Sequence, residues 1–377
     1  MLESIKEEMH QLRTDKLIFI VCLVIPLLVN FMIGWEFNQG TINHVPMAIV
    51  DYDNSQLSRQ IISYFATNDA FDVKYYIQDQ ATLQTLLDRS QVRVGMVIPK
   101  DFSANVTSLR SPTILMFYDG SHMSMTSIAK TKASEILLTT RVGACIKQIQ
   151  GRLGKSYDEA YAMAMPVSFE NRTLYNPTKN FNYFMTPGYG TIICQLGIGL
   201  MAAVCVHFHK DEKKRVLGYI VGKIFFYGVL GSIAILINLF MQICVFKIPC
   251  RGSIIVIVAL SILFMFAIAS LSVAISAWIN NGAVAMAVIG LLLIPNTIMA
   301  GYTWPLISMR SSYQWMAQFI PFAHYGDNIR DLLLKGSMTS GFSDIIFLVG
   351  FVGVMSFIAT VGGHIDKHRK PREVFHR

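Results

Sequence analysis

The chain has 377 residues, of which 53% are hydrophobic and 15% are charged, and its formal net charge is +8. This composition is too apolar for a soluble α/β enzyme of this length, and the apolar residues gather in blocks that a soluble core does not require. The basic residues lie beside these blocks rather than on one folded face, so the positive charge does not indicate a nucleic-acid-binding protein.

Residues 1–16 predict a short amphipathic helix on the cytoplasmic side of a membrane. Leu2, Ile5, Met9 and Leu12 recur at helical spacing, and charged residues fill the other face. Such a helix serves either as a membrane anchor or as a docking surface for a cytoplasmic partner, and the sequence leaves both functions open.

Six apolar segments are long enough to cross a bilayer core of roughly 30 Å as helices. The first covers residues 17–35, and no small-residue cleavage site follows it, so it predicts a transmembrane helix rather than a signal peptide. The other five cover residues 186–206, 222–246, 253–277, 282–301 and 342–362. The sequence therefore predicts a polytopic α-helical membrane protein with six transmembrane helices.

The polar stretch of residues 36–185 predicts an α/β domain inserted between transmembrane helices 1 and 2. Its strand-like runs are residues 46–50, 71–77, 92–98 and 113–118. Helical patterns separate these runs, and a long helical pattern follows the last of them. Strands separated by single helices predict an open sheet of about four strands that is at least partly parallel.

Two patterns in this domain resemble ligand sites. Gly151–Ser156 resembles the last residues of the P-loop motif. The motif also needs a glycine five residues before Gly154, but this position is Ile149 on a predicted helix. Asp51, Asp53 and Asp119 offer carboxylates to a calcium ion, although helix capping and turn formation account for them better.

One further metal pattern lies after the second span. His207 and His209 stand close to Asp211 and Glu212, but the four residues belong to a basic juxtamembrane run. The sequence therefore predicts no metal site and no catalytic site, and it contains no His-Glu-x-x-His motif.

The connection of residues 302–325 is apolar and aromatic, and it is too short to cross a membrane. Pro305 and Pro321 interrupt it. We expect a re-entrant or interfacial segment with Trp304, Trp315 and Tyr325 at the level of the lipid headgroups.

Basic residues indicate the orientation. They are concentrated in the connection of residues 207–223 and in the tail of residues 363–377. By the positive-inside rule both termini are cytoplasmic, and the domain of residues 36–185 is extracytoplasmic.

Polar side chains within the apolar spans are the candidates for a substrate path: Asn30, Gln195, Asn238, Gln242 and Asn296. Hydrogen bonding between helices is the favoured explanation for any one of them, and a substrate path is the alternative. No span has an ionisable residue at its centre, which argues against an ion-coupled transporter and favours an amphiphilic or hydrophobic cargo.

Four ordered segments carry a family resemblance: Val50–Ser55, Gly95–Phe102, Tyr118–Ser121 and the stretch from Gly301 to Gly336. With the order of the spans, they resemble permease subunits of type-2 ABC exporters, in the branch with a large outer domain after the first span. The resemblance covers nearly the whole chain.

The resemblance implies half of a membrane dimer in a bacterial inner membrane, paired with itself or with a similar permease. It also implies a separate cytoplasmic ATPase that uses ATP and Mg²⁺, so this chain itself needs no cofactor. Whether an outer adaptor protein takes part stays open.

The resemblance places contacts with the ATPase in the N-terminal helix and in a charged segment after the second span. The residues concerned are Glu7, Glu8, Asp211, Glu212, Lys213, Lys214 and Arg215. This chain departs from the family pattern because residues 209–218 lack a Gly-Thr pair and the further helical turns, which predicts a short coupling surface.

The expected function is export by alternating access, driven by ATP that the partner hydrolyses. The alternative is a membrane-anchored receptor that uses the outer α/β domain without transport. One span is enough to anchor such a domain, so that alternative leaves five spans unexplained.

Overall fold

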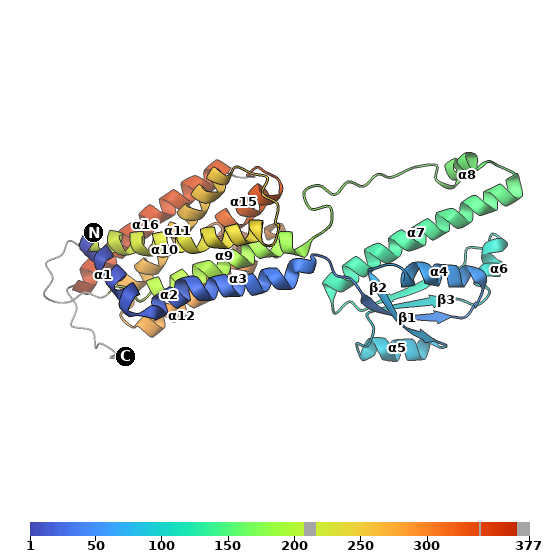
Figure 1. The fold of residues 1–377 in the computed structure, drawn as a ribbon, viewed down its shortest axis with the longest axis horizontal. Coiled ribbons are helices and arrows are strands. Elements are labelled where there is room, and N and C mark those ends of the chain that lie inside the picture. Colours follow the sequence, from blue (N-terminus) through green and yellow to red (C-terminus); the bar gives the residue numbers. More distant parts are fainter. Residues whose placement is uncertain (207–215, 339–340, 368–377) are drawn as a thin grey trace. The chain divides into compact units, whose positions relative to one another are not determined.

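The computed structural model describes residues 1–206, 216–338 and 341–367 (Figure 1). The chain divides into a helical unit, made of Met1–Gly40 and Thr173–Arg377, and an inserted unit, Thr41–Arg172. The inserted unit lies within the range of residues 36–185 that the sequence marks as polar.

The inserted unit contains a four-stranded sheet in the order β2-β1-β3-β4. Its strands are β1 (Val45–Asp51), β2 (Phe71–Ile77), β3 (Val94–Ile98) and β4 (Leu115–Tyr118). β1 pairs in parallel with β2 and β3, whereas β3 and β4 are antiparallel. The predicted open, partly parallel α/β sheet is confirmed.

Helices cover both faces of this sheet. They are α4 (Gln56–Ala66), α5 (Gln80–Asp88), α6 (Phe102–Thr107), α7 (Met123–Leu153) and the separate α8 (Tyr157–Ala164). Alternate residues of β1 point to opposite faces, so Met47 and Ile49 pack with Ile61 of α4 and Phe102 of α6. On the other face, Ala48 and Val50 pack with Leu83 of α5. β1 is therefore the buried centre of the unit.

Carboxylates at the strand ends stabilise the turns. Asp51 Oδ1 accepts hydrogen bonds from the N–H groups of Asp53 and Asn54 at 3.0 and 3.1 Å. Asp119 accepts a 2.6 Å bond from Ser121 Oγ and also pairs with Arg93. These bonds lower the pKa of Asp119 to about 2. The turn-forming function predicted for Asp51 and Asp119 is confirmed.

The segment that resembles a P-loop consists of a helix end and a helix start. α7 ends at Leu153, and Gly154 follows with a φ of +61°, the left-handed conformation that a glycine adopts easily after a helix. Ser156 begins α8 through a reciprocal capping pair with Glu159. No strand precedes this segment, so it lacks the setting of a phosphate loop.

The helical unit begins with the predicted amphipathic helix, α1 (Leu2–Thr14). A nearly continuous helix follows, made of α2 (Lys16–Phe19), the π-helical turn η1 (Ile20–Val24), α3 (Ile25–Glu36) and the short η2 (Phe37–Gln39). The remaining long helices are α9 (Phe181–Ala202), α10 (Val216–Cys244), α11 (Ile254–Trp278), α12 (Gly282–Leu293) and α16 (Gly341–Lys367). Four short helices complete the unit: α13 (Asn296–Met299), η3 (Leu306–Ser308), α14 (Ser311–Ala317) and α15 (Ala323–Leu334).

Five helical segments among the described residues are long and apolar enough to cross a membrane. They are Lys16–Gln39, Val216–Cys244, Ile254–Trp278, Gly282–Met299 and Gly341–Ile365. α9, which corresponds to the predicted span 186–206, is not one of them. Most of the α9 side chains are buried against other helices, so this helix does not need the apolar surface that contact with lipid demands.

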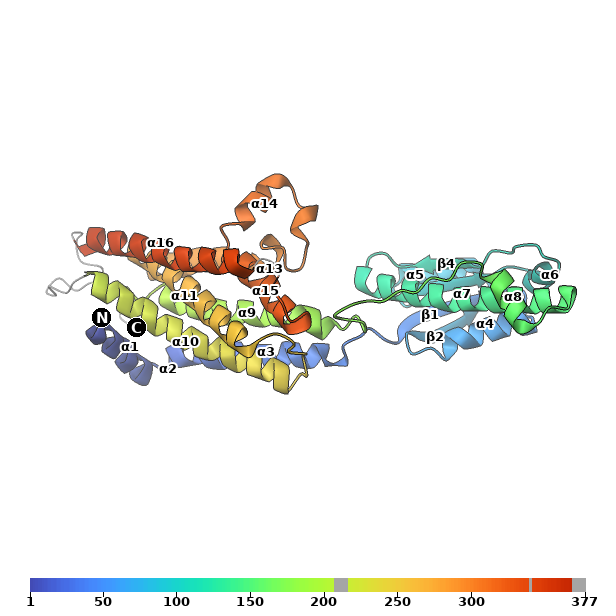
Figure 2. The ribbon, with the colours of Figure 1, turned by 90° about the horizontal axis from the view of Figure 1, so that it is seen from above.

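Residues 302–325 form η3, α14 and the start of α15 rather than one long helix. Their re-entrant or interfacial position stays a prediction, and Tyr325 is fully buried rather than exposed to headgroups. Pro305 precedes η3, and Pro321 lies shortly before α15. Figure 2 shows α14 projecting to the side of the bundle.

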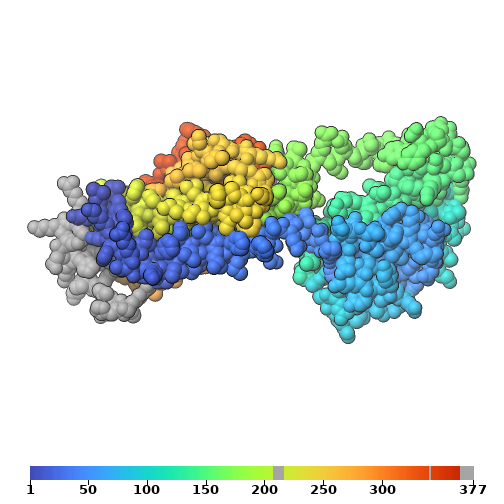
Figure 3. All heavy atoms as spheres, in the orientation of Figure 1, coloured from blue at the N-terminus to red at the C-terminus, as the bar shows by residue number. Residues whose placement is uncertain are grey.

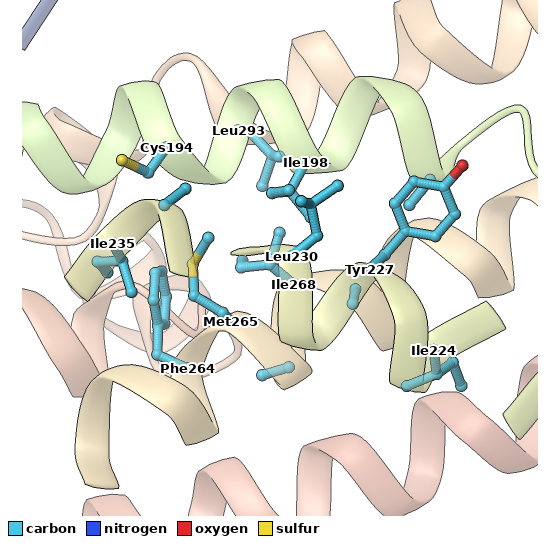
Figure 4. Packing of buried hydrophobic residues seen from close by; sticks show 14 of the residues in the cluster. Cys194, Ile198, Ile224, Tyr227, Leu230, Ile235, Phe264, Met265, Ile268 and Leu293 are labelled. Carbon is cyan, nitrogen blue, oxygen red and sulfur yellow. The ribbon is translucent and has the colours of Figure 1, made fainter. Parts of the chain in front are cut away.

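The core of the helical unit lies where α9, α10 and α11 meet. Figure 4 shows Ile198 of α9, Leu230 of α10 and Ile268 of α11 within one apolar cluster. α3 lies alongside α10 on the face seen in Figure 3. Complementary packing of the side chains determines how these helices are placed, because an apolar side chain gains no hydrophobic free energy when it leaves lipid for the protein interior.

The helical unit is interrupted by the insertion after Gly40, and a backbone hydrogen bond joins the chain on the two sides of this interruption. The N–H of Phe181 donates to the carbonyl of Gly40 at 2.7 Å. Gly40 has a φ of +73°, and the Asn180 side chain fills the space where a Cβ would stand. The junction therefore closes on itself within the helical unit.

Candidate functional site

The five amides predicted for a substrate path are all buried inside a single chain. Their side chains are at most 2% exposed: Asn30, Gln195, Asn238, Gln242 and Asn296. They come from α3, α9, α10 and α13. Their place on a substrate path stays a prediction.

Three of these amides surround one turn of α9. Asn30 Nδ2 donates to the carbonyl of Gly190 at 3.1 Å. From α10, Gln242 Nε2 donates to the carbonyl of Thr186 at 3.1 Å and to Asn238 Oδ1 at 3.2 Å. A Cβ on Gly190 would stand 2.5 Å from Gln242 Nε2, so only glycine allows this approach. We call these residues, Asn30, Thr186, Gly190, Asn238 and Gln242, the amide cluster.

The other two amides lie apart from this cluster. Gln195 Nε2 donates to the carbonyl of Leu293 at 3.4 Å, which links α9 to the end of α12. Asn296 is the first residue of α13, directly after Pro295. The structure therefore brings together three of the five predicted residues.

Several polar atoms of these amides have no hydrogen-bond partner within the described part of the chain. They are Asn30 Oδ1, Gln195 Oε1, Asn238 Nδ2 and Gln242 Oε1. An unpaired buried polar atom costs about 1–3 kcal/mol. The described helices therefore satisfy these amides incompletely, and a second arrangement of α9 that offers them partners would gain hydrogen bonds.

A second cluster fixes α1 to the first turns of α10. The carboxylate of Glu8 forms an ion pair with Lys223 Nζ and accepts a 2.9 Å bond from Tyr227 Oη. Glu8 is fully buried, and the side chains of Lys223 and Tyr227 are 3% and 2% exposed. We call Glu8, Lys223 and Tyr227 the charged anchor.

The same face of α1 carries Ser4, one turn before Glu8. Its hydroxyl donates to the carbonyl of Tyr219 at 3.1 Å. A Cβ on Gly222 would stand 2.8 Å from Ser4 Cβ, which shows how close the two helices come. The polar face of the amphipathic helix thus contacts α10, while Leu2 and Met9 are exposed.

The ATPase contacts predicted for Glu7 and Glu8 stay predictions. Because the Glu8 carboxylate is buried, Glu8 can influence a partner only through the position of α1. Glu7 is half-buried. Asp211, Glu212, Lys213, Lys214 and Arg215 lie outside the described residues, as do His207 and His209.

Lys223 and Tyr227 were not identified by the sequence. The third span was predicted to begin at residue 222, which left Lys223 among the basic residues of the connection. The described part of α10 already includes Val216, so Lys223 lies about two turns inside the helix. Lys223 stands directly before a long apolar run, and this position was the sequence signal for a buried ion pair, because a cation there needs a buried partner.

A metal site finds no support in the geometry. Within residues 1–206, 216–338 and 341–367, no three His, Cys, Asp or Glu side chains stand close enough to hold a metal ion. Asp53 Oδ2 accepts a bond from the N–H of Ser103 at 3.0 Å, so this carboxylate also links secondary structure.

Comparison with known proteins identifies the family. Residues 16–361 match the family model described as "ABC-2 family transporter protein". The chain is 19% identical over 322 residues to "Probable multidrug ABC transporter permease YbhR" of Escherichia coli, covering 83% of this chain and 84% of the relative. It is 20% identical over 343 residues to "Probable multidrug ABC transporter permease YbhS" of the same organism, covering 88% of each.

A further match covers only part of the chain. Over 187 residues it is 27% identical to "ABC transporter G family member 20" of Dictyostelium discoideum, covering 45% of this chain and 25% of that protein. The family model, by contrast, covers almost the whole described chain, including the first apolar helix, the inserted unit and most of α16. This multi-pass membrane chain belongs to the ABC-2 family of transporter proteins.

Proposed function

We propose that the chain is the permease subunit of an ATP-driven exporter that moves an amphiphilic or hydrophobic cargo out of the cytoplasm or the inner leaflet. The family match over residues 16–361 carries this proposal. Relatives named as multidrug ABC transporter permeases, aligned over more than four-fifths of both chains, support it. The receptor alternative has no comparable support, since five apolar helices exceed what an anchor requires.

In this proposal ATP and Mg²⁺ bind to a separate cytoplasmic ATPase, and two permease copies, or this chain and a similar permease, form the transport path. α9 is the sixth transmembrane helix, shielded from lipid by its neighbours. The amide cluster then lies beside the path and changes partners when α9 moves during alternating access. Polar side chains without an ionisable group suit a cargo that is not a small ion.

Purification of the tagged full-length chain from its native cells tests the ATPase partner. We expect a stoichiometric ATPase subunit whose hydrolysis rate depends on the permease. Reversing the charges of Lys213, Lys214 and Arg215 should lower this stimulation at least tenfold while membrane insertion persists.

The matched control reverses the charges of Lys367, Arg369 and Lys370, which are also basic and follow a predicted span. This control should leave the stimulation unchanged. A chain that purifies alone, with no associated hydrolysis, would favour the receptor function instead.

The proposed orientation places both termini in the cytoplasm and the inserted unit outside, in a bacterial inner membrane. Ser90, exposed at the end of α5, reports this directly. In a background with Cys145, Cys244 and Cys250 replaced by serine, a Ser90→Cys chain should react with a membrane-impermeant maleimide before cell lysis, once the outer membrane is permeabilised. Labelling only after lysis would reverse the orientation.

A further inference from the structure

A pocket of about 390 Å³ lies between α14, α15 and the first turn of α16. α15 also packs against α9 near its start, where the Tyr302 hydroxyl donates to the carbonyl of Phe184 at 2.6 Å. The pocket is therefore at the end of the helical unit from which the insertion leaves. Neither the amide cluster nor the charged anchor contributes to it.

Charged groups of both signs line this pocket. Asp327 Oδ1 pairs with Arg330 Nη2 at 2.5 Å, and Asp331 Oδ1 pairs with Lys335 Nζ at 2.8 Å. Asp344 of α16 is a third acid, bonded to His324 Nδ1 at 2.6 Å. Three carboxylates thus face two permanently charged bases.

The most accessible charges are one acid and one base. The Asp327 side chain is 50% exposed and the Lys335 side chain is 39% exposed, whereas the side chains of Arg330 and Asp331 are 18% and 9% exposed. The Arg330 guanidinium is further held against the Tyr302 ring at 4.6 Å. A ligand therefore meets the Asp327 carboxylate and the Lys335 ammonium first.

Exposed apolar side chains lie on or next to the short elements that carry the lining residues. Each of them is within two residues of a lining residue: Ile307 (88% exposed), Trp315 (63%), Phe319 (57%), Phe342 (80%) and Ile346 (57%). Figure 2 shows α14, which carries Trp315, standing out from the bundle. Exposed tryptophan and phenylalanine beside charged groups are typical of a membrane interface.

We infer that this pocket binds the headgroup of a zwitterionic phospholipid that carries a primary amine. The ammonium pairs with Asp327, the phosphate pairs with Lys335, and the acyl chains extend along Trp315 and Phe319. Charge-assisted hydrogen bonds of both kinds are stronger than neutral ones. This lipid site does not depend on the proposed export function.

The balance of charge excludes the other common headgroups. A purely anionic headgroup has no partner for Asp327 and meets the excess of carboxylates. A quaternary ammonium cannot donate a hydrogen bond, so it loses the contact with Asp327 that a primary ammonium forms. The pocket therefore discriminates by charge sign and by N–H donors.

Native mass spectrometry of the full-length chain tests this site. Equal amounts of phosphatidylethanolamine, phosphatidylglycerol and phosphatidylcholine with the same acyl chains are added, and retained lipid is counted. We expect phosphatidylethanolamine to be retained about tenfold better than the other two. Asp327→Asn and Lys335→Gln should each abolish most of this preference.

The control variants are Glu36→Gln and Lys247→Gln, which remove an exposed acid and an exposed base outside the pocket. Both should keep the wild-type preference. Equal retention of the three lipids, or a preference that survives both pocket variants, would overturn the inference. If either pocket variant fails to elute as a folded species, the other variant and the wild-type preference decide the outcome.

Discussion

Replacing Glu8 with alanine should destabilise the helical unit by about 3–5 kcal/mol, because the Lys223 ammonium then stays buried without a counter-charge. The hydroxyl of Tyr227 loses its acceptor in the same step. Both groups lie on α10, so the loss should detach α1 from the bundle. The effect is measured by heating the purified chain and determining the fraction that remains monodisperse at each temperature.

The swapped pair Glu8→Lys with Lys223→Glu distinguishes the ion pair from other functions of these residues. It restores opposite charges at the same two positions, so it should recover part of the lost stability. Lys6→Ala, an exposed residue of the same helix, is the matched control and should change stability by less than about 0.5 kcal/mol. Equal stability of Glu8→Ala and Lys6→Ala would contradict the charged anchor.

Replacing Gly197 with alanine should be the most damaging small substitution in α9. A Cβ at this position would stand 2.5 Å from the carbonyl oxygen of Val21, which belongs to the backbone of η1 and cannot rotate away. Overpacking of this kind costs about 1–3 kcal/mol. We expect a lower unfolding temperature and a smaller yield of folded protein.

Gly350→Ala in α16 is the matched control, since nothing lies within 4 Å of a Cβ built there. It adds the same methyl group to another apolar helix and should leave the chain as stable or slightly more stable. A Gly197→Ala chain that unfolds at the same temperature as Gly350→Ala would show that η1 and α9 separate without cost.

The sequence predicted the strands and helices of the inserted α/β unit well, because this unit has the polar and apolar residue patterns of a water-soluble domain. β1 and β3 are buried runs, and Asp51 and Asp119 mark the turns that the structure has. A short apolar run bounded by turn signals indicates a strand buried on both faces when the alternative is water.

The same reasoning was weaker in the helical unit, where lipid and protein interior are both apolar. The pattern of α1 separated its two faces but did not reveal that Ser4 and Glu8 contact α10. The basic residues before the third span led us to assign Lys223 to the connection, although it lies inside α10. The contact between Gly190 and Gln242 depends on helix rotation, which composition does not specify.

The self-closing junction at Gly40 and Phe181 has an evolutionary consequence. Since a backbone hydrogen bond already joins the two ends, the membrane-domain fold does not rely on what lies between them. Residues 41–172 can therefore diverge, lengthen or be exchanged as a cassette while selection on the helices continues unchanged. A lineage can in this way acquire a new inserted unit by a single recombination event.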